Sequence, residues 1–208
     1  MQYLVLAVLW IAWCVLHSAM ISVSVTDYLK RRLGIAFRFY RFTFNMVALL
    51  TLVPVAMYER SINGHWAFWW QGSNIFFQIM LLAVAFLLFF AGARHYDFLQ
   101  FVGFRQIRAG ASGTTLSKTD DLDTTGILGI IRHPWYTGSI IVIWARELMP
   151  ATVVTNIILT IYLIVGAYLE ERKLVIKYGQ KYRTYQQKVP MFIPCKFSKS
   201  KTEKERGH

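Results

Sequence analysis

The chain has 208 residues, of which 55% are hydrophobic, and its mean hydropathy is +0.38. Because a soluble domain must present much polar surface to water, this composition excludes an ordinary water-soluble domain and predicts a membrane protein. The net charge of +12 does not indicate nucleic-acid binding, since the basic residues lie between apolar runs and after the last one, where anionic lipid headgroups are the expected partners. Two cysteines, Cys14 and Cys195, indicate neither a disulfide framework nor a metal site.

Five apolar runs follow one another along the chain, and each approaches the roughly 20 residues that a helix needs to cross a bilayer. Pro150 joins the last two runs so tightly that they are predicted to form a helical hairpin over 127–169. The runs cover residues 3–23, 40–57, 75–93, 127–149 and 151–169. We therefore expect an all-α, polytopic membrane helix bundle of about five transmembrane helices.

Basic residues divide the connections between these runs into two groups. All but two of the 23 lysines and arginines lie in residues 25–41, in 94–132 or from 170 onward, and the exceptions are Arg60 and Arg146. Because short cytoplasmic connections are enriched in lysine and arginine, the N-terminus is predicted outside and the C-terminus in the cytoplasm. We expect an integral, multi-pass protein of a bacterial inner membrane with its functional residues facing the cytoplasm.

Near the cytoplasmic end of the fourth run stands a basic and aromatic cluster, Arg132-His133-Pro134-Trp135-Tyr136-Thr137-Gly138. Proline suits the first turn of a helix, because the amide that it lacks would have no partner there. Backbone amides at such a helix start, flanked by an arginine and a histidine, could hold an anionic group such as a carboxylate. A membrane anchor would use the same residue types, so both interpretations stay open at this point.

Two adjacent acids, Glu170 and Glu171, lie at the end of the fifth run. Acids at a helix C-terminus oppose the helix dipole, and a local rule broken in this way often marks a functional site. Since the hairpin turns back at Pro150, the acids are expected at the depth of residues 132–138. A basic cluster facing an acidic pair is a candidate pocket for a ligand of mixed charge, although the two basic residues that follow the acids also suit a solvated charge cluster.

Other polar residues are weaker candidates, each with a structural alternative. The tyrosine-rich segment that contains Tyr182 and Tyr185 could cover a flat aromatic ligand or anchor an interfacial helix. After the third run, His95 and Asp97 could accept a proton or orient a substrate, or could cap a helix. Polar groups inside the runs could line a cavity or pack internally, and they are His17 and Asn45. We recognise no metal-ligand spacing.

The ordered pattern in the last third of the chain resembles the isoprenylcysteine carboxyl methyltransferase and phospholipid methyltransferase superfamily. It consists of Arg132-His133-Pro134-x-Tyr136-x-Gly138, then Glu170-Glu171, then Tyr178-Gly179-x-x-Tyr182-x-x-Tyr185, then Val189-Pro190. The front half resembles the branch of methanethiol S-methyltransferases and NnrU-like proteins. Its residues are His17-Ser18, Tyr40-Arg41-x-x-x-Asn45, Asp97-Phe98 and Gly103-Phe104-Arg105-Gln106.

The resemblance implies an integral membrane enzyme that uses S-adenosyl-L-methionine, with a cytoplasmic C-terminal segment that closes the cofactor pocket. Three N-terminal helices (1–93) would precede a catalytic half (94–195) and a charged, disordered tail (196–208). The residues that would bind the cofactor are Arg132, His133, Pro134, Tyr136, Gly138, Glu170, Glu171, Tyr182 and Tyr185. The residues that would act on or hold the methyl acceptor are Arg105, His95 and Glu171 for catalysis, and His17, Asn45, Asp97 and Gln106 for binding.

Methyl transfer from a sulfonium is an in-line displacement that requires alignment and exclusion of water more than acid or base catalysis. A thiol acceptor must also lose its proton, which a nearby arginine or histidine favours. A small thiol is the first expectation for the acceptor, followed by a prenylcysteine-type carboxylate or a phospholipid amine. A non-catalytic, NnrU-like membrane accessory protein is the alternative outside enzymes. Membrane lipids are the other expected partners, with no metal and no nucleic acid.

Overall fold

The structure is a computed structural model that describes residues 1–62, 64–65, 68–95, 107 and 121–194. Every regular element in these ranges is a helix, and Phe68 and Leu148 form an isolated antiparallel bridge. The helices in chain order are α1 (Gln2–Ile21), α2 (Val23–Leu33), the 3-10 helix η1 (Gly34–Phe39), α3 (Tyr40–Ser61), α4 (Asn74–Ala93), the 3-10 helix η2 (Gly126–Gly129), α7 (Pro134–Trp144), α8 (Pro150–Tyr178) and α9 (Gln180–Lys188). The expected all-α membrane bundle is confirmed.

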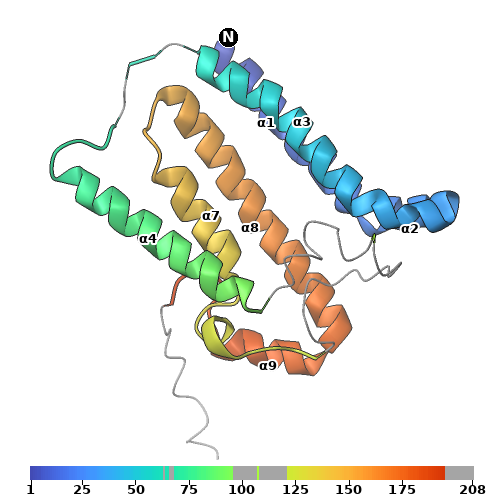
Figure 1. Cartoon of the computed structure of the whole chain (residues 1–208). Coiled ribbons are helices and arrows are strands. Elements are labelled where there is room, and N and C mark those ends of the chain that lie inside the picture. Colours follow the sequence, from blue (N-terminus) through green and yellow to red (C-terminus); the bar gives the residue numbers. More distant parts are fainter. Residues whose placement is uncertain (63, 66–67, 96–106, 108–120, 195–208) are drawn as a thin grey trace, which may run out of the picture.

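The long helices pack in the spatial order α3, α1, α8, α7, α4, so that α8 lies in the middle (Figure 1). α8 contacts α1 on one side and α7 on the other. At its end the chain turns at Gly179, whose φ of 56° suits a residue without a side chain. α9 then runs across the ends of α7 and α8 (Figure 1). The C-terminal part of the chain is thereby placed against the start of α7.

Four helical stretches in the described part of the chain are long and apolar enough to cross a membrane. Three of them are α1, α4 and α8, and the fourth is the stretch Val23–Ser61, which contains α3. Residues 127–149 do not form one spanning helix as expected, because α7 has only 11 residues and a crossing needs about 17–25. Tertiary contacts occupy both flanks of α7: the amides of Arg132 and His133 bond to a later segment, and Leu148 pairs with Phe68.

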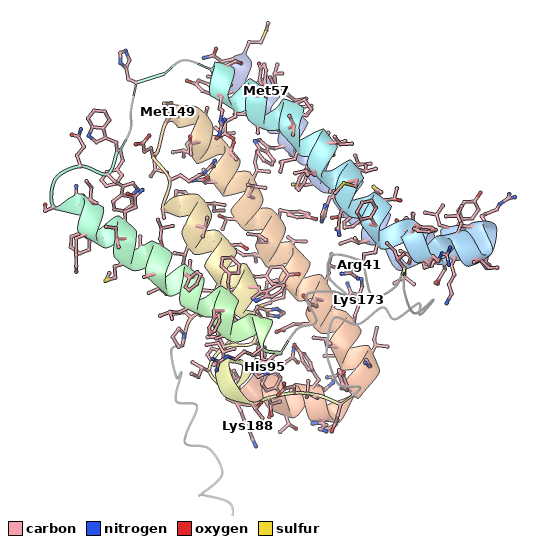
Figure 2. All side chains as sticks on the ribbon, in the orientation of Figure 1. Arg41, Met57, His95, Met149, Lys173 and Lys188 are labelled. Atoms are coloured by element: carbon pink, nitrogen blue, oxygen red, sulfur yellow. The ribbon has the colours of Figure 1, made fainter. Side chains whose placement is uncertain are left out.

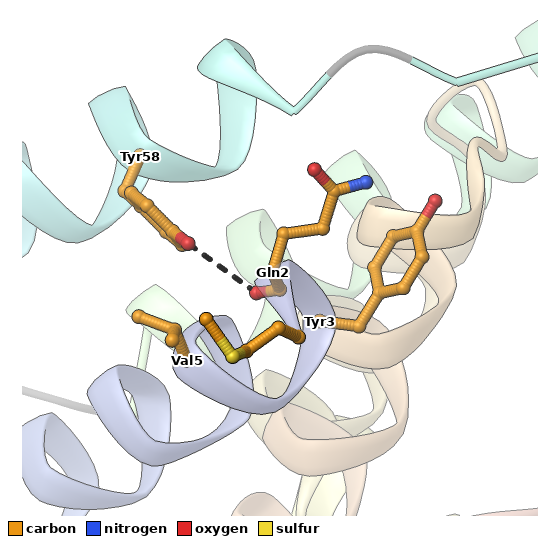
Figure 3. Close-up of a pocket in the computed structure, with 5 residues that line it drawn as sticks. Gln2, Tyr3, Val5 and Tyr58 are labelled. Carbon is orange, nitrogen blue, oxygen red and sulfur yellow. Dashed lines mark hydrogen bonds between the residues drawn. The ribbon is translucent and has the colours of Figure 1, made fainter.

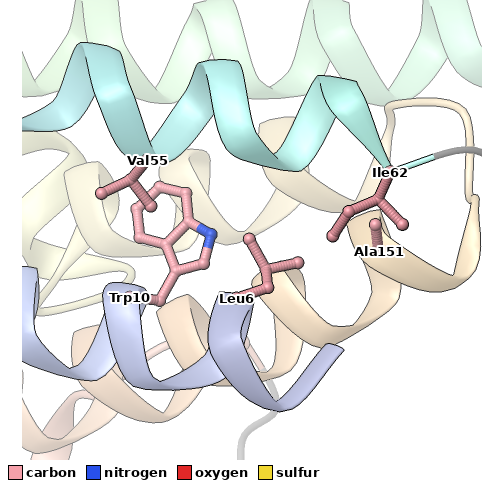
Figure 4. Close-up of a cluster of buried hydrophobic side chains, with 5 residues drawn as sticks. All are labelled: Leu6, Trp10, Val55, Ile62 and Ala151. Carbon is pink, nitrogen blue, oxygen red and sulfur yellow. The ribbon is translucent and has the colours of Figure 1, made fainter. Parts of the chain in front are cut away.

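A hydrophobic cluster joins the first helices to the hairpin (Figure 4). Leu6 and Trp10 of α1 meet Val55 of α3 and Ile62, the residue directly after α3, together with Ala151 at the start of α8. A hollow of about 500 Å³ lies close by, where the Tyr58 hydroxyl donates to the Gln2 carbonyl oxygen over 3.4 Å (Figure 3). This end of the bundle is thus mainly apolar.

The opposite end carries most of the positive charge. Figure 2 places Arg41, Lys173 and Lys188 there, and Met57 and Met149 at the other end. Which end faces the cytoplasm stays a prediction of the charge rule.

Arg146, at the apolar end, is held by acidic and amide groups. Its guanidinium lies 3.5 Å from Glu59 Oε1 and donates to Asn156 Oδ1 over 2.7 Å, and the Thr155 hydroxyl donates to Glu59 Oε2 over 2.9 Å. An arginine that is neutralised in this way does not weaken the charge asymmetry between the two ends. The cluster also ties the end of α3 to the turn between α7 and α8.

α4 and α7 approach so closely that glycines are needed between them. A Cβ atom on Gly92 would clash with the Trp135 ring, and one on Gly138 would lie 3.2 Å from Phe89. The indole of Trp135 also donates to the Phe89 carbonyl oxygen over 3.2 Å. This packing fixes the position of the first turn of α7, which follows His133.

We predict that Gly92→Leu destabilises the protein by about 1–3 kcal/mol, because overpacking forces the two helices apart. Ala93→Leu is the matched control, since Ala93 is exposed on the same turn of α4. Thermal unfolding of the purified protein in detergent measures both variants. Equal stability of the two would contradict the close approach.

Candidate functional site

The Arg132 guanidinium forms a two-pronged ion pair with Glu171 at the positively charged end of the bundle. Its Nε donates to Glu171 Oε1 over 2.6 Å, and a terminal nitrogen donates to Oε2 over 3.2 Å. The side chains of Arg132 and Glu171 are only 9% and 7% exposed. Planar guanidinium and carboxylate groups match in this geometry, and burial makes each group depend on the other.

Further hydrogen bonds extend this pair to the C-terminal segment. Gln186 Nε2 donates to Glu171 Oε2 over 2.7 Å, and His133 Nε2 lies 3.2 Å from Oε1. The remaining terminal nitrogen of Arg132 donates to the carbonyl oxygens of Gln186, over 2.9 Å, and of Val189. We call this group, formed by Arg132, His133, Glu171, Gln186 and Val189, the latch, because it joins α7, α8 and α9.

The chain that follows α9 pairs with the residues before α7. The Arg132 amide donates to the Pro190 carbonyl oxygen over 3.0 Å, and the His133 amide donates to that of Met191 over 3.1 Å. Pro134 begins α7 as expected. Carbonyl oxygens of the chain itself thus accept from the two amides that precede α7, whereas an anion site at the amides of its first turn stays a prediction.

The adjacent acids Glu170 and Glu171 contact different partners. The Tyr136 hydroxyl donates to Glu170 Oε2 over 2.9 Å, and the Tyr136 ring packs near Gly166, one turn earlier on α8. Neighbouring residues of a helix point about 100° apart, which directs Glu171 toward the latch and Glu170 toward α7. The structure therefore assigns the two carboxylates to separate surroundings.

Two tyrosines of α9 form a small core with Val189. Tyr182 is 1% exposed and Tyr185 is 8% exposed. Burial raises the pKa of both phenols above the ordinary value, so they stay neutral at physiological pH. The Tyr185 hydroxyl donates to the Leu128 carbonyl oxygen in η2. Both side chains thus hold α9 in place from its inner face.

A groove of about 470 Å³ opens between α8 and α9 beside the latch. Glu171 and Gln186 contribute to its wall. Its other lining residues are Tyr168, Arg172, Val175, Ile176 and Arg183. The volume lies within the range of small-molecule sites, and acidic, basic and apolar groups all face it.

His95 lies at the same end of the bundle (Figure 2). Its Nδ1 atom is 2.6 Å from Asp123 Oδ2, and the amide and hydroxyl of Thr125 donate to the other carboxylate oxygen over 2.9 and 2.7 Å. Burial raises the pKa of Asp123, but these hydrogen bonds outweigh burial and leave the pKa below its ordinary value. Since Asp123 lies close to η2, this pair is connected to α9 through Tyr185.

The structure does not bring every predicted residue to this cluster. His17 packs between the Trp13 and Phe44 rings, at centroid distances of 5.1 and 4.8 Å, and Asn45 is half-buried on α3. Gly138 packs against α4. The predicted residues Asp97, Arg105 and Gln106 lie outside the described part of the chain.

Sequence reasoning missed Gln186, Asp123 and the carbonyl groups of residues 189–191. Gln186 directly follows a predicted tyrosine, which could have drawn attention to it. The carbonyl groups leave no trace in the identity of a side chain, so only the structure could reveal them.

Known proteins are similar to this chain over different lengths. A family model described as "NnrU protein" matches residues 5–192. Methanethiol S-methyltransferase 2 of Bradyrhizobium diazoefficiens is 28% identical over 141 residues, which are 66% of this chain and 54% of that protein. Methanethiol S-methyltransferase of Pseudomonas deceptionensis is 42% identical over 66 residues, which are 31% of this chain and 25% of that protein.

The matched regions therefore cover about half of the first of these relatives and a quarter of the second. No solved structure matches the chain.

We predict that Glu171→Gln loosens the latch, because Arg132 then stays buried without its counter-charge. Removing one partner of a buried ion pair costs about 3–5 kcal/mol. Hydrogen–deuterium exchange should become faster in residues 180–192. Glu170→Gln is the matched control, because its carboxylate contacts Tyr136 and not α9. Equal exchange in the two variants would show that the latch does not hold the C-terminal segment.

Proposed function

Since this chain belongs to the NnrU family, we propose that it is an integral membrane methyltransferase that depends on S-adenosyl-L-methionine and methylates a small thiol. The observation that carries the proposal is the cluster of Arg132, His133, Glu170 and Glu171 at one end of the bundle. The names of the relatives support the reaction and favour a methanethiol-like acceptor.

The residues present fit a methyl donor that carries an ammonium, a carboxylate and a sulfonium. Glu170, which contacts Tyr136 and does not line the groove, offers a carboxylate for a cationic group. The groove beside Glu171 has Arg172 and Arg183 for an anionic group. Arg132 already gives its hydrogen bonds to the latch, so we assign it to holding the C-terminal segment rather than to the donor itself. Tyr182 and Tyr185 are likewise assigned to holding the C-terminal segment, because they form the buried core with Val189.

The donor supplies an activated methyl group on a positively charged sulfur. In the proposed reaction a carbon–sulfur bond forms to the thiolate of the acceptor as the bond to the sulfonium breaks, and the donor leaves as a neutral thioether. The thiol proton must go to a base or to solvent before this step. His95, whose other ring nitrogen lies beside the Gly126 position, is our candidate for favouring the thiolate.

The remaining residues would align the reactants and exclude water. The latch keeps α9 across the ends of α7 and α8, and the packed glycines keep α7 against α4. Such positioning lowers the barrier of an in-line displacement without any proton transfer by the protein in the transfer step itself. We place this site on the cytoplasmic face of a bacterial inner membrane, in the half of the chain that begins at residue 94.

Calorimetric titration of the purified chain with S-adenosylhomocysteine tests donor binding. We predict that Glu170→Gln weakens binding by about tenfold or more, the effect of one lost charge-assisted hydrogen bond. Exchange in residues 180–192 should stay unchanged in this variant. Glu171→Gln should weaken binding and also accelerate exchange there, because it acts through the latch. Glu147→Gln, an exposed acid at the opposite end, is the control.

Transfer of a radiolabelled methyl group tests the acceptor. Methanethiol, a farnesylcysteine analogue and phosphatidylethanolamine would be compared under the same conditions, and labelling of methanethiol is expected. Binding without labelling of any of the three would refute the proposed substrate class. Absence of S-adenosylhomocysteine binding would refute the enzyme and favour a non-catalytic membrane protein.

A further inference from the structure

α2 differs from the long helices in that none of its residues is buried. It begins where Ser22, in an extended conformation, ends α1, and it ends at Gly34, where φ is 50°. Figure 1 shows α2 turned away from the axes of α1 and α3 and projecting from the bundle. α1 alone has the 20 residues, about 30 Å, that a crossing requires, so α2 follows a completed crossing.

The exposed surface of α2 and η1 combines cations with apolar side chains. The guanidinium carbon of Arg32 lies 5.6 Å from the centre of the Tyr28 ring, and that of Arg38 lies 4.7 Å from the Phe39 ring. Residues 23–39 contain four basic residues and a single acid. The exposed apolar side chains are Val23, Tyr28, Leu33, Ile35 and Phe39.

This combination suits a surface where apolar chains and anions meet. Arginines stacked on aromatic rings keep their charge outward while the rings contact apolar groups. A short, basic, amphipathic helix with exposed aromatic residues is typical of the boundary between headgroups and acyl chains. A partner that offers only polar groups would leave the Ile35 side chain, which is 85% exposed, without an apolar contact.

We propose that α2 and η1 form a docking surface for anionic phospholipid headgroups, with Arg31, Arg32 and Arg38 binding the phosphates. The apolar side chains of this surface enter the adjoining acyl region. The surface lies on helices other than those of the latch, so the proposal is independent of the methyl-transfer reaction. Its effect is to fix the height and tilt of the α1–α3 pair in a charged leaflet.

Hydrogen–deuterium exchange of the full chain in nanodiscs tests the proposal. Exchange in residues 23–39 should be at least about fivefold slower in phosphatidylglycerol than in phosphatidylcholine, since one basic residue near an anionic surface contributes about that factor. The triple variant R31Q/R32Q/R38Q should lose this difference, whereas R31K/R32K/R38K should keep it.

The triple variant K173Q/K177Q/K188Q is the matched control, because it removes three exposed charges elsewhere at the same end. It should leave the lipid dependence of residues 23–39 unchanged. If this control also lost the slower exchange in phosphatidylglycerol, the lipid dependence would come from the total positive charge at this end and the proposal would be overturned. Equal exchange of residues 23–39 of the wild-type chain in the two lipids would overturn it as well.

Discussion

A buried arginine–glutamate pair determines how the C-terminal third of the molecule is arranged. Removing both charges of Arg132 and Glu171 from water is costly unless each finds enough hydrogen bonds, and neighbouring helices alone do not supply them. Gln186 and the carbonyl groups that follow it complete the set, so α9 and the chain after it must lie across α7 and α8. The position of the groove beside α8 is a consequence of that requirement.

The start of α7 is held from a second direction by close packing. Gly92 lets α4 approach Trp135, so the turn that carries His133 and Tyr136 cannot shift along the bundle. Close packing and the ion pair therefore act on the same few residues from opposite sides. A mixed-charge cluster held in this way is suited to aligning two small reactants, which is what a displacement reaction needs from a protein.

Much of the fold and part of the site could be predicted from the sequence. The apolar runs near α1, α3, α4 and α8 carry their own signal, because hydropathy over about 20 residues is a local property. The short α7 was predicted too long, since apolar residues also occur in its flanks, where tertiary hydrogen bonds replace the helix. The different surroundings of Glu170 and Glu171 depend on which helix faces each acid, and adjacent letters in a sequence do not carry that information.

α8 connects two polar clusters, since Thr155 bonds to Glu59 near one end and Glu171 bonds to Arg132 near the other. The two residues are separated by about 24 Å along the helix axis. Thr155 and Glu171 are both buried, so these polar contacts lie between helices and do not face acyl chains. A slide of α8 along its own axis would break both contacts at once, and the depth of α8 relative to its neighbours is therefore fixed at two heights.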